Sequence, residues 1–130
     1  MFLERDGRWL FLCGRPGKWF AGRWNALGGG VEPGEDVATA AAREVREECG
    51  LTPRELRLVG TVQVQAEPVV MLFVFRAELP PGEVVPGHEG ELRWLPTHEV
   101  ESGGLPFVED VVGLFARVRR DAPFHLATRP

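Results

Sequence analysis

The hydrophobic pattern of the chain first predicts strands. Short apolar runs at Phe2–Leu3 and Arg8–Cys13 flank the turn pair Asp6-Gly7, which indicates an antiparallel hairpin whose first strand is very short. Apolar and polar residues alternate over Leu56–Gln65, as expected for a half-exposed strand. The nearly continuous apolar run Val69–Ala77 is typical of a central strand.

Two other segments have the periodicity of amphipathic helices. The alanine-rich segment Glu35–Cys49 begins with acidic residues, and Gly50 follows it as a natural helix stop. Its apolar residues recur every four positions and form the expected buried stripe: Val37, Ala41, Val45 and Cys49. The segment Val108–Arg119 also gathers its apolar residues on one face, so we expect a second helix there.

Loops, one more strand and a helical turn complete the expected order. Gly14–Gly30 is rich in glycine, yet it contains three aromatic residues: Trp19, Phe20 and Trp24. Pro80–His88 is a second loop, Glu91–Leu95 a short strand, and Pro96–Val100 a helical turn that begins at Thr97. The order β-β-α-β-β-β-α predicts the α/β class, as an α/β/α sandwich with a mixed β-sheet and a short N-terminal strand.

Composition narrows the class of protein. The chain has 130 residues, of which 44% are hydrophobic, enough for one core, so we expect a single domain over 1–130. No segment is long and apolar enough to cross a bilayer, and charged residues interrupt the first apolar run. We therefore expect a cytoplasmic protein without a membrane partner. Its two cysteines show no metal-ligand spacing, so neither a disulfide scaffold nor structural zinc is expected.

The charge balance also limits the partners. A net charge of -4 and a pI near 5.4 argue against a nucleic-acid polymer as the main partner, because binding to a phosphate backbone relies on clustered positive charge. A small anionic molecule is compatible with this balance. The sequence does not decide between a monomer and a homodimer.

The most informative stretch is GGVEPGEDVATAAAREVREECGL, residues 29–51. On the predicted helix, Glu44, Glu47 and Glu48 have the spacing i, i+3, i+4, which places three carboxylates within about 100° of one helix face. Three anions so close together repel one another. Convergence of these hard oxygen ligands on Mg²⁺ or Mn²⁺ would remove the penalty and create a site for a polyphosphate.

A solvated acidic helix face explains any single one of these glutamates more simply. It does not explain Gly29, Glu35, Arg43 and Gly50 at their offsets, and the complete pattern has a chance probability on the order of 10⁻⁵. Arg43 lies one turn before Glu47, near the place where Glu35 would fold over. We therefore interpret Arg43 as a positional partner of the carboxylates.

These residues and spacings resemble the signature of the Nudix hydrolases in full. The resemblance implies metal-assisted hydrolysis of a nucleoside diphosphate linked to a further group, with a carboxylate accepting the proton of the attacking water. The implied Mg²⁺ ligands, for which Mn²⁺ is an alternative metal, are Glu44, Glu47, Glu48 and the carbonyl of Gly28. Spacing alone does not say which glutamate is the base.

A later loop offers one more carboxylate. Glu89 lies five residues before Trp94 and resembles the extra glutamate of MutT-type members of the family. Glu91 is the alternative candidate, and a charged loop is the simpler explanation of both residues.

The run from Ala21 to Gly29 is similar to the corresponding stretch of the MutT-type branch, whose substrates are oxidised purine nucleoside triphosphates. The resemblance implies that Asn25 reads the base edge, that Trp19 stacks on the base, that Arg15 lies near the nucleotide, and that Gly29 lets the backbone approach the site. A turn-forming amide, a loop anchor and a surface arginine are the competing explanations of the first three.

A weaker similarity concerns Glu109 and Asp110, which occupy the place of paired acidic residues that bind the purine in that branch. Here the pair is Glu-Asp instead of two aspartates, and the preceding aromatic residue is absent. Favourable interaction with a helix dipole also explains acidic residues at the start of a helix.

Three functions follow as hypotheses. The first is a Mg²⁺-dependent diphosphatase that converts an oxidised or noncanonical purine dNTP, such as 8-oxo-dGTP, to a nucleoside monophosphate and pyrophosphate. The second keeps the chemistry but takes ADP-ribose or a dinucleoside polyphosphate, a class for which Pro68 offers a weak parallel. The third is a nucleotide-binding module without turnover, against which the intact glutamates argue.

Overall fold

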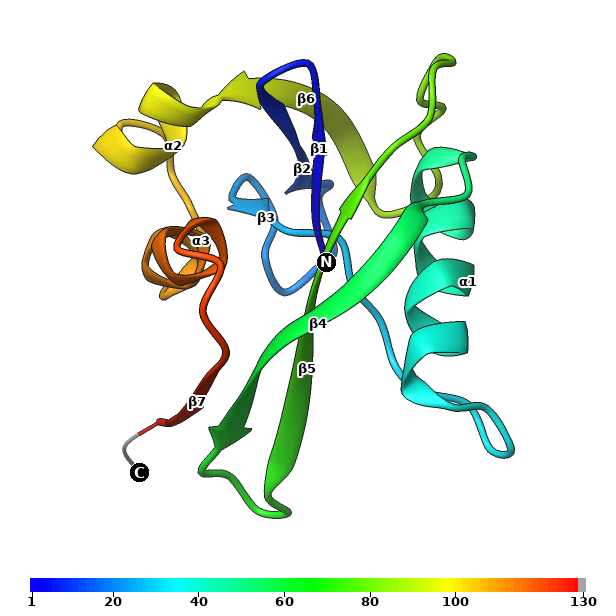
Figure 1. Cartoon of the computed structure of the whole chain (residues 1–130). Helices are drawn as coiled ribbons and strands as arrows, with labels where there is room; N and C mark the ends of the chain where they lie inside the picture. The colour runs from blue at the N-terminus through cyan, green and yellow to red at the C-terminus, as the bar shows by residue number, and fades with distance from the viewer. Residues whose placement is uncertain (129–130) are drawn as a thin grey trace.

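The computed structural model describes residues 1–128, which form one mixed β-sheet flanked by helices (Figure 1). The elements, in chain order, are β1 Phe2–Arg5, β2 Arg8–Gly14, β3 Trp24–Asn25, α1 Val37–Cys49, β4 Arg54–Val64, β5 Val70–Glu78, β6 Gly90–Pro96, α2 Thr97–Ser102, α3 Val111–Arg119 and β7 Phe124–Ala127. The sheet order is β3-β2-β1-β5-β4-β7, and β6 also pairs with β2.

Strand β2 organises the half of the sheet nearest the site. Strand β6 runs antiparallel to it along its whole length, from Arg8↔Pro96 to Gly14↔Gly90. Strands β1 and β3 therefore share the opposite edge of β2, one after the other. Because β1 and β5 are parallel while β4 and β5 are antiparallel, the sheet is mixed, as predicted.

The sheet separates two apolar cores, since successive side chains of a strand point to opposite faces. Alternate residues of β1 and β2 enter the core shared with α2 and α3: Phe2, Trp9 and Phe11. Their neighbours enter the core shared with α1: Leu3, Leu10 and Leu12. Figure 1 shows α1 on one face and α2 with α3 on the other, which confirms the predicted α/β/α sandwich.

Helix α1 begins two residues later than predicted. The side chain of Asp36 accepts a hydrogen bond from Thr39 N at 2.7 Å and so caps the helix, which leaves Glu35 in the preceding loop. Gly50, at φ 82°, ends the helix in the left-handed conformation as expected. Within the predicted stripe, Ala41, Val45 and Cys49 are buried, whereas Val37 is only half-buried.

Helix α3 begins at Val111, three residues later than predicted. The preceding backbone pairs instead with β3, because Val108 N donates to Trp24 O at 2.9 Å and Phe107 forms a bridge with Trp24. Glu109 and Asp110 therefore precede the helix and do not belong to its first turn. Asp110 has φ 70° and its side chain makes no capping hydrogen bond, so favourable capping does not explain this residue.

Two strands were not predicted. Strand β3 lies within the segment Gly14–Gly30, which was expected to be a loop throughout, and β7 follows the last helix and runs parallel to β4. A side chain at Gly60 of β4 would overlap the ring of Phe124, so this glycine permits the close approach of β7. Helix α2 follows Pro96, and no side chain caps its start.

The N-terminal strand β1 is short, as predicted, and along β5 it reaches only the end formed by Arg76–Glu78. Within the described residues, the rest of that β5 edge has no strand partner, and Val69–Phe73 are exposed. No helix in residues 1–128 has the length and apolar character needed to span a membrane. Cys13 and Cys49 are both free thiols.

Candidate active site

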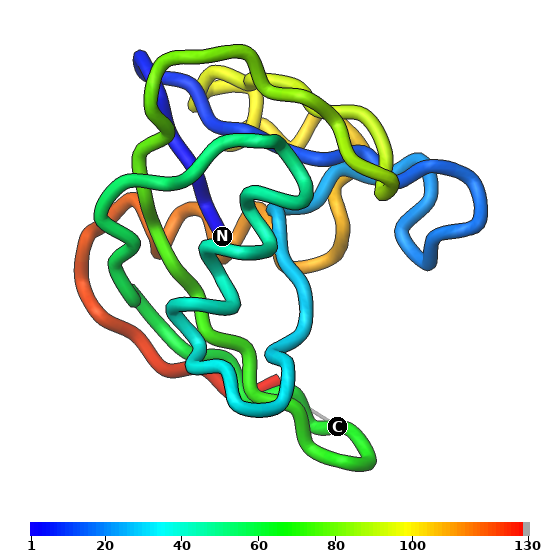
Figure 2. Tube along the Cα trace, turned by 90° about the vertical axis from the view of Figure 1, so that its right-hand side faces the viewer, coloured from blue at the N-terminus to red at the C-terminus, as the bar shows by residue number. Residues whose placement is uncertain are grey.

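The site lies where the loop before α1 meets the carboxylate-bearing face of that helix. Figure 2 shows residues 26–36 running alongside α1. Gly28 N donates to Glu48 at 3.3 Å, and the carbonyl of Gly30 accepts from Arg43 at 2.9 Å. These contacts fix the glycine-rich loop against the helix.

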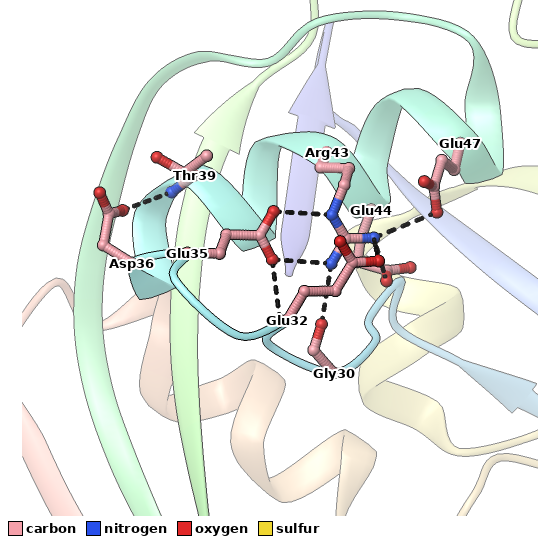
Figure 3. A network of polar contacts seen from close by, with 8 residues as sticks. All are labelled: Gly30, Glu32, Glu35, Asp36, Thr39, Arg43, Glu44 and Glu47. Carbon is pink, nitrogen blue, oxygen red and sulfur yellow. Dashed lines mark hydrogen bonds and ion pairs between the residues drawn. The ribbon is translucent and has the colours of Figure 1, made fainter.

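Arg43 connects the acidic residues of this region, as its spacing predicted (Figure 3). Its Nε and Nη2 donate to the two carboxylate oxygens of Glu35 at 2.8 and 2.9 Å. Its Nη1 donates to Glu44 at 2.8 Å and to Glu47 at 3.3 Å. We call Gly30, Glu35, Arg43, Glu44 and Glu47 the Arg43 cluster. Because the planar guanidinium binds Glu35 and Gly30 of the loop as well as the glutamates of α1, it fixes the loop and the helix relative to each other.

The Arg43–Glu35 ion pair is strongly coupled. Hydrogen bonds from Arg43, and next from the backbone of Glu32, lower the pKa of Glu35 from 4.5 to about 2. The same pair raises the pKa of Arg43 well above its ordinary value. Both side chains are largely shielded from solvent, with 12% of the Glu35 side chain and 17% of the Arg43 side chain exposed. Both members of the pair are therefore charged near pH 7.

Glu48 has the opposite environment. It is the one buried charged side chain among the described residues, at 4% exposure. Burial, followed by the negative charge of Glu44, raises the pKa of Glu48 from 4.5 to about 8. The carboxyl is therefore protonated near pH 7, and a cation that binds it must displace that proton.

The side chains of the three helix glutamates do not converge on one point. In residues 1–128, no three carboxylate, histidine or cysteine side chains are close enough together to hold an ion. Arg43 draws Glu44 and the exposed Glu47 toward itself, whereas Glu48 points to Gly28. The donor set of carboxylate oxygens nevertheless fits Mg²⁺ or Mn²⁺, which prefer hard oxygen ligands.

Gly29 lies directly beneath Glu44. A β-carbon at this position would overlap the Glu44 carboxylate, whereas one at the adjacent Gly30 would meet nothing within 4 Å. Glycine is therefore required at position 29 by the close approach of the carboxylate.

We expect Gly29→Ala to lower turnover at least tenfold with little change in thermal stability, because the added methyl group displaces the carboxylate of Glu44 and disturbs no core packing. Steady-state kinetics with thermal unfolding would measure both effects. Gly30→Ala is the matched control and should behave like the parent. Equal activity of both variants would contradict the requirement for glycine at position 29.

Glu89 joins the site from the loop before β6. Its charge adds to the rise in the pKa of Glu48, and its carboxylate lies 3.2 Å from the ammonium of Lys18. Glu91 instead lies on β6 and pairs with Arg93 at 3.5 Å. Of the two later carboxylates considered, Glu89 is the one whose charge acts on the α1 glutamates.

The residues considered for base recognition are dispersed. Asn25 is half-buried on β3, next to the segment that carries Glu109 and Asp110, both of which are exposed. Trp19 is 71% exposed and contacts Phe20, with ring centroids 5.2 Å apart. Arg15 is also exposed and lines a cavity of about 460 Å³ with seven other residues: Cys13, Gly14, Pro86, Gly87, His88, Gly90 and Glu91.

Sequence reasoning missed three contributors to the site. Glu32 supplies the backbone N–H that binds Glu35, and Gly30 supplies a carbonyl to Arg43. Lys18 provides the ion pair to Glu89. Glu32 had a readable signal, since it stands three residues before Glu35 across a Pro-Gly turn. Lys18 had no signal beyond being the single lysine of the chain.

Comparison with known proteins places this geometry in a family context. Residues 1–113 match the family model of the NUDIX domain. A MutT protein from Bacillus halodurans has a similar structure, with a TM-score of 0.83 and 27% identity over 99% of this chain and 87% of that one. A NUDIX hydrolase from Nitrosomonas europaea follows, with a TM-score of 0.76 and 25% identity over 97% and 73%.

Two kinds of curated relatives are similar in sequence. An oxidized purine nucleoside triphosphate hydrolase from Danio rerio is 38% identical over 77 residues, which cover 57% of this chain and 49% of the relative. An NAD-capped RNA hydrolase NudC from Pseudomonas putida is 33% identical over 116 residues, which cover 86% and 42%. The matched segments thus span about half the length of these relatives, or less.

Proposed function

The chain belongs to the Nudix hydrolase family, and from this membership we propose that it is a divalent-metal-dependent pyrophosphohydrolase acting on a nucleotide. The observation that carries the proposal is the arrangement of Glu44, Glu47 and the buried Glu48 on one face of α1, with Arg43 holding the first two. A group of three carboxylates of this kind can bind a metal ion that in turn binds the phosphates of a nucleotide. We assign this activity to one domain over 1–130.

The residues that would hold Mg²⁺, or Mn²⁺, are the three helix glutamates and the carbonyl of Gly28. The bound metal would neutralise negative charge on the phosphate oxygens and lower the pKa of the attacking water. Arg43 holds Glu44 and the loop in place, and Glu35 orients the guanidinium of Arg43. Glu89 and the helix glutamates are the candidates to accept the proton of that water.

The substrate class proposed first is a nucleoside triphosphate with an oxidised or noncanonical purine, such as 8-oxo-dGTP, cleaved to a monophosphate and pyrophosphate. The Danio rerio relative, which is named for such substrates, supports it. The bridge between Trp24 and Phe107 supports it too, because it brings the segment that carries Asn25 next to the segment that carries Glu109 and Asp110, and an amide and two carboxylates can together match a purine edge. Trp19, Arg15 and Gly29 are assigned to the approach of the base and the phosphates.

A second candidate is a dinucleotide with a central diphosphate, such as ADP-ribose or NAD⁺. The supporting observation is the similarity to NudC proteins over 86% of this chain. Those relatives are named as hydrolases of NAD-capped RNA, whereas the acidic charge of this chain favours a free nucleotide over an RNA. We propose a cytoplasmic enzyme that works on small molecules.

With Mg²⁺ present, we expect pyrophosphate release from 8-oxo-dGTP or 2-hydroxy-dATP to exceed release from canonical dNTPs. Product release measured across one panel, with ADP-ribose, NAD⁺ and a dinucleoside polyphosphate included, tests this. Release of AMP from ADP-ribose in preference would support the second candidate. Binding of nucleotides without any product would support a module without turnover.

The same panel tests the base-reading role of Asn25. Replacement by alanine should reduce kcat/KM for the preferred base most and change hydrolysis of the other bases less, because the lost hydrogen bonds are specific to one purine edge. An equal loss for every base would mean that Asn25 only shapes the loop.

A further inference from the structure

The pair between Lys18 and Glu89 is placed next to the proposed metal site, although neither residue belongs to α1. Lys18 Nζ lies 3.2 Å from a Glu89 oxygen, and both side chains are partly exposed, at 31% and 38%. Exposed single-point pairs of this kind contribute little to stability. The pair is therefore easy to exchange for other partners.

Two of the cations near the carboxylates, Arg43 and Lys18, differ in how many of their hydrogen-bond donors the protein uses. Arg43 donates through Nε, Nη1 and Nη2 to three carboxylates and one carbonyl, so its donors are occupied by the protein. Lys18 has three ammonium donors, and Glu89 is its side-chain partner among the described residues. Lys18 thus has donors left for a ligand, whereas Arg43 does not.

Backbone hydrogen bonds hold the pair at this place. The loop before β6 is attached to the end of α1 by Gly87 N to Glu48 O at 3.2 Å and by Val85 N to Cys49 O at 2.8 Å. The loop after β2 is attached to Glu89 itself, because Arg15 N donates to Glu89 O at 3.0 Å. Lys18 and Glu89 are therefore carried by two loops that are joined to each other and to the metal-binding helix.

We propose that the Lys18–Glu89 pair is a charge-matched latch that a metal–polyphosphate complex opens, with Lys18 becoming a ligand of a phosphate group and Glu89 turning to the cation. This inference rests on the proposed function. A metal–polyphosphate carries both charges needed to replace the pair, so neither residue is left without a partner. A metal alone would strand Lys18, and a metal-free nucleotide would strand Glu89.

The latch makes metal and nucleotide binding cooperative. Each ligand alone must break the pair, whereas the second ligand finds the pair already broken, so each raises the affinity of the protein for the other. The site therefore prefers a nucleotide that is already bound to its metal ion. Binding of the metal alone or of the nucleotide alone is weaker.

Replacing Lys18 with methionine separates the two halves of the latch. Without its partner, Glu89 is free, so the nucleotide-free protein should bind Mn²⁺ about threefold more tightly, the size expected for loss of an exposed pair. The KM for the Mg²⁺–nucleotide should rise about tenfold, because one charge-assisted contact to phosphate is lost. Affinity for Mn²⁺ is measured by titration calorimetry, and KM by product release.

Two variants serve as controls for this experiment. Arg46→Met removes an exposed cation from the same helix as the glutamates and should leave both quantities near those of the parent. In the double variant Lys18→Met with Glu89→Gln, the gain in Mn²⁺ affinity should disappear, because no carboxylate is released. Thermal unfolding checks that each variant is folded. If Lys18→Met does not fold, Lys18→Gln takes its place.

The opposite signs of the two effects make the result decisive. A fall in the Mn²⁺ affinity of Lys18→Met would overturn the latch. If the parent hydrolyses nucleotides, a variant with unchanged Mn²⁺ affinity and unchanged KM would overturn it as well. A parent protein that neither binds nor hydrolyses any nucleotide of the panel would overturn the proposed function instead, and the Mn²⁺ titration would still report on the ion pair.

Discussion

Replacing Glu48 with glutamine should lower turnover at least about a hundredfold while leaving the protein as stable as the parent or more stable, because a metal-binding charge is lost and core packing is not. Since the pKa of Glu48 in the folded protein is about 8, its carboxyl is already neutral near pH 7, and glutamine has nearly the same shape and polarity. The measurement is kcat together with thermal unfolding.

The pH dependence of stability provides the second readout for Glu48. The unfolded chain ionises this group near pH 4.5, whereas the folded protein does so only near pH 8. Protonation is therefore retained by the folded state, and the contribution of this carboxyl to stability falls as the pH rises through this interval. Glutamine does not titrate, so the variant should gain stability relative to the parent between pH 5 and 8.

Glu47→Gln should also lose about a hundredfold in turnover, although Glu47 is exposed and contributes little to the fold. A suitable control is Glu99→Gln, which removes an exposed carboxylate from α2, remote from α1. Unchanged turnover in both Glu47→Gln and Glu48→Gln would remove the basis for placing the metal on α1.

Arg43→Ala should reduce turnover by about a hundredfold and, unlike the glutamate variants, should also lower the melting temperature. The substitution leaves Glu35 and Glu44 without their shared donor and releases the carbonyl of Gly30, so the loop is no longer held against α1. Steady-state kinetics and thermal unfolding near pH 7 measure the two losses.

Acid titration tests whether the stability loss in Arg43→Ala comes from its ion pair. In the parent the pKa of Glu35 is about 2, below its ordinary 4.5, so the stabilisation is complete above pH 4.5 and is lost as the pH falls toward 2. The difference in stability between parent and Arg43→Ala should therefore shrink over the same interval. A constant difference from pH 7 to pH 2 would contradict the ion-pair explanation, and Arg46→Ala is the control for loss of an exposed arginine on α1.

The metal-binding helix could be predicted from the sequence because its signals are local. The alanine-rich period, the Gly50 stop and the glutamate spacing all lie within one short window, and Arg43 stands one turn from its partners. The start of the helix was placed two residues early because acidic residues suit both the cap position and the first turn. In the structure Asp36 is the cap, and Glu35 precedes the helix to meet Arg43.

The remaining features depend on contacts that no local spacing encodes. Strands β3 and β7 have two and four residues, too few for a period to be recognised, and both are defined by pairing with distant strands. The side chain of Glu47 turns toward Arg43, with 3.3 Å between the carboxylate and the guanidinium. Helical spacing places a residue on a face, but it does not decide which partner the side chain selects.

The Arg43 cluster and the Lys18–Glu89 pair differ in how far apart along the sequence their residues lie. Arg43 contacts Glu35 and Gly30 across 8 and 13 residues, whereas Lys18 and Glu89 are 71 residues apart. Contacts of short sequence separation form with little loss of chain entropy, so the Arg43 cluster can assemble as soon as α1 and its preceding loop are folded. The Lys18–Glu89 contact must wait until β6 has joined β2. Local opening of that strand pair would therefore separate Glu89 from Lys18 while the helix carboxylates stay in place.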